Sequence, residues 1–142
     1  MDDRIERRID SIEDWINLLR EIHTEKEGTK VVREAKENLL RKVSEAVIDI
    51  ASRIIALQGF ERPDTYADYF EVLEDEEIIT TDLSKRLKEM AKFRNLVVHQ
   101  YHKIEMEELN SIIEEDLEDI EKFVSQVERH GNSEWRAKSP TK

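Results

Sequence analysis

The sequence predicts an all-α protein, an up-down bundle of about five helices. Charged residues make up 40% of its 142 residues, whereas glycine occurs three times and proline twice. This composition is typical of long helices, because a β sandwich needs many turns. Apolar residues also recur three and four positions apart through most of the chain, which is the period of one face of a helix. A chain of this length can bury a sizeable core.

The first two helices are expected at about 3–23 and 29–58. In the first, apolar residues step by four, three, four and three along one stripe, formed by Ile5, Ile9, Ile12, Ile16 and Leu19. In the C-terminal half of the second, Ile48, Ala51 and Ile55 spread apolar side chains over much of the circumference. Such a helix is either central in the bundle or also packed against a second subunit.

Turn and capping residues delimit the other helices. Gly59 and Pro63 end the second helix, and Asp64 or Thr65 is expected to cap a short helix over about 66–76. The next helix is expected over about 83–100, capped by Thr81 or Asp82, and the last over about 105–130, ended by Gly131. Residues 1–130 therefore form one bundle, and the polar residues 131–142 are predicted to be a disordered tail.

Charge and composition exclude several classes of protein. The formal net charge of −11 argues against broad nucleic-acid binding, so any such role needs a local cleft with its own positive residues. The absence of cysteine excludes disulfides and a cysteine-based zinc site. The acidic runs at 71–77 and 114–121 are expected to be solvated faces. They lack the pattern of a calcium loop or of paired Glu-x-x-His ligands, so no metal and no cofactor are expected. No membrane span or signal peptide is recognisable, and a cytoplasmic location is the default expectation.

One segment interrupts the apolar pattern of the fourth helix. The stripe formed by Leu83, Leu87 and Met90 continues through Arg94 and Tyr101, so a guanidinium stands where an apolar residue is expected. Polar groups in apolar surroundings carry a desolvation cost unless they are paired. Such a local inconsistency is where functional sites are expected.

The spacing of the polar residues in this segment favours a site shared by two subunits. Asn95 and His99 are four residues apart and share a helix face. Arg94 and His99 are separated by about 140° around the axis and roughly 7.5 Å along it, so they do not form a tight pair on a regular helix. A cleft between two symmetry-related copies of this helix would let the two side chains converge on one ligand.

The chemistry of this set suits RNA cleavage. Histidine transfers protons near neutral pH, and arginine presents a planar fork to phosphate oxygens. Together they can promote attack of a 2′-hydroxyl on the adjacent phosphodiester without a metal, a reaction restricted to RNA. Taken alone, the same residues also fit a buried structural pair or an interface ion pair.

The segment resembles the Arg-x4-His-x-Tyr motif of HEPN proteins, in particular HepT-type toxins of prokaryotic HEPN–MNT modules. Arg94, His99 and Tyr101 occupy the motif positions, and Asn95 directly after the arginine is also typical. The resemblance extends to residues 62–70, to Ile78–Ile79 and to the order of the helices. It covers nearly the whole chain except the last dozen residues.

The resemblance implies a homodimeric, metal-independent endoribonuclease paired with a minimal nucleotidyltransferase antitoxin. It implies that Arg94 stabilises the scissile phosphate, His99 acts as general acid or base, and Asn95 supports them. Tyr101 would be the acceptor of AMP transferred by the antitoxin. The sequence departs from many relatives at residues 102–104, which leaves cleft access and RNA preference open.

Two other interpretations remain open at this point. The chain could be a non-catalytic HEPN subunit that binds a nucleotide or positions a substrate for the nucleotidyltransferase. It could also be a helical dimerisation module whose polar motif serves the interface.

Overall fold

The computed structural model describes residues 2–23, 29–100 and 106–131, and within 92–100 it describes the backbone alone. The regular elements of these ranges are five helices: α1 (Asp3–His23), α2 (Lys30–Gln58), α3 (Tyr66–Asp75), α4 (Thr81–Gln100) and α5 (Met106–His130). The all-α class and the expected helix bounds are confirmed to within one or two residues. The expected tail from residue 132 onward lies outside the described residues.

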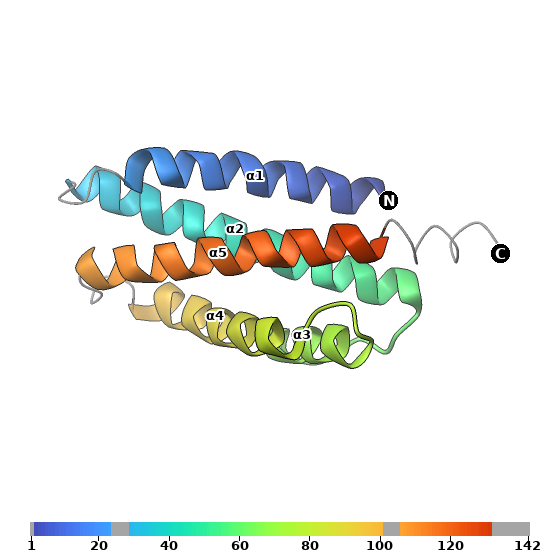
Figure 1. The fold of residues 1–142 in the computed structure, drawn as a ribbon. Coiled ribbons are helices and arrows are strands. Elements are labelled where there is room, and N and C mark those ends of the chain that lie inside the picture. Colours follow the sequence, from blue (N-terminus) through green and yellow to red (C-terminus); the bar gives the residue numbers. More distant parts are fainter. Residues whose placement is uncertain (1, 24–28, 101–105, 132–142) are drawn as a thin grey trace.

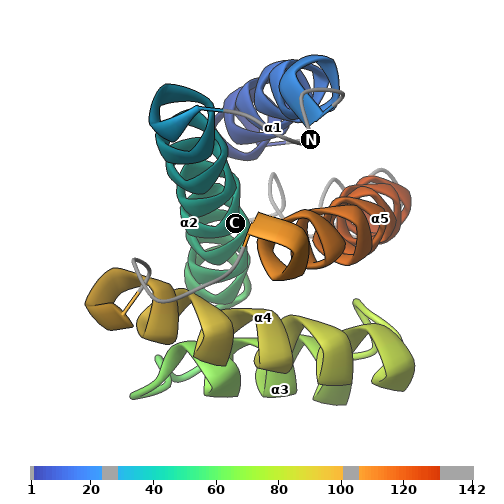
Figure 2. The same cartoon turned by 90° about the vertical axis from the view of Figure 1, so that its left-hand side faces the viewer.

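The long helices alternate in direction, and α2 lies at the centre of the bundle (Figure 1). It contacts each of the other four helices. Viewed from the end, α5 lies between α1 and the α3–α4 pair (Figure 2). This central position accounts for the broad apolar surface of α2, and a second subunit is not required to explain it.

Local hydrogen bonds set the helix ends. Gly59 adopts the left-handed conformation (φ 73°) after α2, where its N–H bonds the carbonyl of Ala56 at 3.2 Å. The N-terminal cap of α3 is Thr65, one of the two residues expected to cap this helix. The expected cap of α4 at Thr81 or Asp82 is wrong, because the hydroxyl of Thr80 accepts from the N–H of Leu83 at 3.2 Å.

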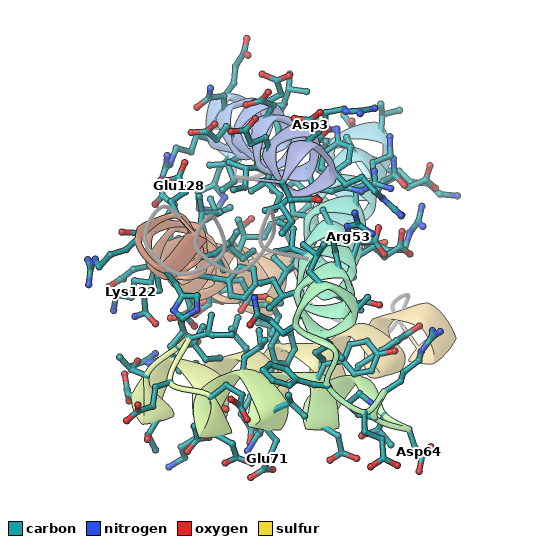
Figure 3. The ribbon with its side chains drawn as sticks, turned by 90° about the vertical axis from the view of Figure 1, so that its right-hand side faces the viewer. Asp3, Arg53, Asp64, Glu71, Lys122 and Glu128 are labelled. Carbon is teal, nitrogen blue, oxygen red and sulfur yellow. The ribbon has the colours of Figure 1, made fainter. Side chains whose placement is uncertain are left out.

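The predicted apolar stripes form the core. The stripe of α1 is buried along its length, and the stripe of α4 is buried from Leu83 to Met90. The rings of Phe70 in α3 and Phe123 in α5 meet edge-on, with their centroids 6.3 Å apart. Leu57, an apolar residue in the last turn of α2, is 40% exposed. Glu71 and Lys122, labelled in Figure 3, point away from the core. Over the described ranges, no helix is long and apolar enough to span a membrane.

Two carboxylates of the acidic run on α5 are buried, whereas the sequence predicted a solvated face. Asp119 lies 3.7 Å from Arg86 of α4, which offsets part of the increase in its pKa caused by burial. Asp116 is 9% exposed, and its buried Oδ2 atom has no hydrogen-bond partner in the described part of the protein. Burial, with the charges of Asp119 and Glu115 adding to it, raises the pKa of Asp116 to about 7.

We predict that Asp116→Asn stabilises the protein more at pH 8 than at pH 5. The folded-state pKa lies above the unfolded value, so ionisation of Asp116 disfavours the fold increasingly as pH rises from about 4 to about 7. The penalty at high pH is on the order of 4 kcal/mol at most. Denaturant unfolding at both pH values measures it, with Glu108→Gln, at an exposed position of the same helix, as control. A gain equal at the two pH values would contradict the assignment.

Candidate active site

The motif residues lie in the last two turns of α4. Arg94, Asn95 and His99 are carried by a helix that runs without interruption from Thr81 to Gln100. The rotation and rise expected between Arg94 and His99 therefore hold for the backbone. Their side chains, and the whole of Tyr101, lie outside what the structure describes.

Two contacts fix how the first half of α4 packs on α5. Arg86 lies 3.7 Å from Asp119, and the N–H of Thr80 donates to Oε1 of Gln126 at 3.0 Å. Toward its C-terminus α4 diverges from α5 (Figure 2), so these contacts do not fix what faces residues 94–99.

A pocket of about 380 Å³ lies at the start of α5. The residues that line it come from the first turns of α5: Met106, Glu107, Asn110, Ser111 and Glu114. Glu114 bonds His23 of α1, so this face of α5 is directed toward α1, whereas Asp119 is directed toward α4. The acidic pocket is therefore not on the side of α5 that meets α4.

Lys88, which precedes the motif on α4, is engaged in ion pairs. Its ammonium lies 3.0 Å from Glu71 and 3.8 Å from Glu74, so it joins α4 to α3. The side chain of Lys92 and the whole of Lys103 lie outside the described residues. Among the side chains that are described, no three His, Asp or Glu gather in a group suited to a metal ion.

His23, at the end of α1, is mostly buried. Its side chain is 14% exposed, its Nε2 lies 2.9 Å from Oε1 of Glu114, and its buried Nδ1 has no partner in the described structure. The sequence carries no signal for this contact, because the two residues are 91 positions apart.

Lys36 is a second polar residue that the sequence interpretation missed. It is fully buried, and its Nζ donates to Oδ1 of Asn110 at 2.9 Å. A signal was present, because Lys36 interrupts the apolar stripe that runs through Val32, Leu40 and Val43. This is the same kind of interruption that marked Arg94.

Solved structures of toxin–antitoxin complexes share this fold. A crystal structure of a toxin–antitoxin with AMP-PNP matches with a TM-score of 0.83 and 26% identity, over 90% of this chain and 99% of that one. The tri-AMPylated HEPN toxin of Shewanella oneidensis in complex with an MNT antitoxin matches with a TM-score of 0.83 and 27% identity, over 91% and 99%. The fold, with the motif helix at its edge, is that of a HEPN protein.

Sequence comparison identifies the family. The family model described as ribonuclease HepT-like matches residues 5–127, and the chain belongs to this family. The mRNA nuclease HepT of Shewanella oneidensis is 34% identical over 88 residues, which are 62% of this chain and 66% of that protein. A protein of Archaeoglobus fulgidus is 30% identical over 125 residues, 88% of this chain and 93% of that protein. The membership confirms the resemblance inferred from the motif.

We predict that Glu114→Ala lowers the Tm by roughly 2–5 °C, because His23 then loses its described partner while it stays largely buried. Thermal unfolding followed by circular dichroism measures this change. Glu115→Ala, which removes an exposed carboxylate from the adjacent position, is the control and should change the Tm by less than about 1 °C. Equal losses in the two variants would show that the pair with His23 does not stabilise the fold.

Proposed function

We propose that this protein is the toxin of a HEPN–MNT toxin–antitoxin module, a metal-independent endoribonuclease that acts in the cytoplasm and is neutralised by a nucleotidyltransferase antitoxin. The single observation that carries the proposal is the Arg94-x4-His99-x-Tyr101 motif at the end of α4 in a chain of the HepT-like family. The mRNA nuclease among its relatives supports the activity, and the MNT complex of a structural neighbour supports the partner.

In the proposed reaction, the 2′-oxygen of the RNA attacks the adjacent phosphorus and the 5′-oxygen leaves. His99 transfers a proton, as the base that takes it from the 2′-hydroxyl or as the acid that gives one to the 5′-oxygen. Arg94 stabilises the negative charge that develops on the phosphoryl oxygens, and Asn95 supports the two side chains. The products are a 2′,3′-cyclic phosphate and a 5′-hydroxyl.

We propose that the reacting site is shared by two protomers. The backbone positions of Arg94 and His99 lie about 140° apart around α4, so a single helix is not expected to bring both residues onto one phosphate. A homodimer in which the ends of two α4 helices face each other would supply the arginine from one edge of a cleft and the histidine from the other. This arrangement also gives a protein of net charge −11 a local positive site for RNA.

We predict that His99→Ala lowers RNA cleavage by 100-fold or more, because it removes the proton-transfer group. A mixed-sequence single-stranded RNA is incubated with the purified protein, freed of AMP, in the presence of EDTA. His130→Ala at the end of α5 is the matched control and should cleave as the wild type does. Replacing the RNA with its 2′-deoxy counterpart should abolish cleavage.

The same experiment tests the alternative function. Wild-type protein that leaves RNA intact, and that binds ATP, would favour a non-catalytic HEPN subunit of a nucleotidyltransferase. Cleavage that is unchanged in His99→Ala would show that the motif histidine is not the proton-transfer group.

We predict that Tyr101→Phe retains RNA cleavage but resists neutralisation. The tyrosine oxygen is the proposed acceptor of AMP, and bulky phosphates at the mouth of the cleft would repel the RNA backbone. Co-incubation with the cognate nucleotidyltransferase and ATP, followed by intact-mass measurement, should show AMP addition to the wild type and not to Tyr101→Phe. Tyr66→Phe, at an exposed tyrosine of α3, controls for the loss of a hydroxyl. AMP addition to Tyr101→Phe at the wild-type level would place the acceptor elsewhere.

A further inference from the structure

The outer side of the α1–α2 pair is a strip of surface that no other described helix covers (Figure 2). Two contacts along this strip join the helices. Arg8 of α1 lies 3.5 Å from Asp49 of α2, and the ammonium of Lys42 lies 5.9 Å from the centroid of the Trp15 ring. The contacting residues are equally spaced along the two helices, so both contacts give one antiparallel register. We call the strip that these residues mark the α1–α2 seam.

Large apolar side chains are exposed in the seam. Leu18, one turn after Trp15 on the same side of α1, is 47% exposed. The register places it level with Leu39 of α2, which is partly buried. Val31, about three turns before Lys42 on the same face of α2, is 75% exposed. Apolar residues that are grouped on a surface in this way mark sites of interaction.

The seam carries more cations than carboxylates, although the net charge of the chain is −11. Arg4, on the same face of α1 as the Trp15 ring, and Lys42 form no ion pair with a carboxylate of the described residues. The two other cations of the seam, Arg8 and Arg53, are each paired with one carboxylate. The excess positive charge favours an acidic partner.

An acidic protein surface complements the seam better than RNA or a second copy of this chain does. Single-stranded RNA stacks its bases on aromatic rings, but Leu18 and Val31 offer no ring, and Lys42 already lies over that of Trp15. A two-fold dimer through the seam would bring its unpaired cations close to the same cations of the second copy. A protein face with apolar side chains bordered by carboxylates matches both the exposed apolar residues and the charge.

We propose that the α1–α2 seam is the surface on which the nucleotidyltransferase antitoxin docks, through apolar side chains bordered by carboxylates. This inference rests on the proposed function and names the surface that its protein partner uses. Figure 2 shows α1 and α4 on opposite edges of the bundle, so a partner on the seam need not cover the motif helix. Docking is therefore measurable apart from RNA cleavage.

The proposal predicts that Leu18→Glu weakens binding of the cognate nucleotidyltransferase by 10-fold or more, because it places a carboxylate among the apolar side chains of the seam. Isothermal titration calorimetry of the two purified proteins without ATP measures the Kd of docking separately from AMP transfer. Leu57→Glu, at a leucine of similar exposure in the last turn of α2, is the matched control and should bind within about twofold of the wild type. Because both positions are exposed, the Tm of both variants should stay within about 2 °C of the wild type.

A charge reversal tests the electrostatic part of the proposal. Lys42→Glu should raise the Kd by roughly 5- to 20-fold at low salt, whereas Lys85→Glu, the same change at an exposed position of α4, should leave it within about twofold. Wild-type binding should weaken as the salt concentration rises, and Lys42→Glu should lose part of that dependence. Leu18→Glu and Lys42→Glu should both cleave the mixed-sequence RNA at the wild-type rate.

The outcomes separate this proposal from the proposed function. A wild-type Kd in Leu18→Glu or in Lys42→Glu overturns the docking surface and leaves the partner in place. Slower RNA cleavage with unchanged docking would assign the seam to RNA, and a smaller oligomer of Leu18→Glu in light scattering would assign it to a second copy. Either result overturns the proposal. Wild-type protein that does not bind the nucleotidyltransferase overturns the partner itself, whereas loss of the nuclease activity alone leaves the docking measurement valid.

Discussion

The antiparallel packing of α4 on α5 is the constraint on which the site depends. Two contacts on one side of these helices, Arg86 with Asp119 and Thr80 with Gln126, agree on a single register. That register holds the first half of α4 against α5, and the central helix α2 contacts both helices. The motif is therefore carried by the end of a helix whose earlier turns are packed on the core, an arrangement that fixes functional groups better than a free loop.

The bundle keeps ionisable groups inside, at a cost to stability. Asp119 is offset by Arg86, and Lys36 is bound by Asn110, whereas Asp116 has a buried oxygen without a described partner. Such groups usually lower stability relative to apolar replacements, and proteins keep them where activity needs them. All three lie on α2 or α5, the helices that flank the motif-bearing end of α4. The interior of this small protein therefore holds ionisable groups as well as apolar side chains.

The acidity of the chain limits how it can meet RNA. Several described cations are already engaged: Lys88 with two carboxylates of α3, Arg20 with Glu121, and Arg53 with Asp2. Ion pairs of this kind reduce the positive potential that reaches a distant phosphate. Attraction of RNA to the proposed nuclease would therefore come from a local site, with Arg94 contributed by each protomer of a dimer.

The sequence alone determined the helices and the candidate site, because both depend on neighbours along the chain. The three-and-four spacing predicted the buried stripes of α1, α4 and α5, and the break in that spacing at Arg94 marked the motif. Tertiary structure decided which other charges are inside. The pairs Lys36–Asn110, His23–Glu114 and Arg86–Asp119 join residues 33 to 91 positions apart, and no local pattern specifies such partners. Asp116 and Asp119 looked like members of a solvated acidic run, and only the packing of α5 against α4 showed that their side of the helix faces inward.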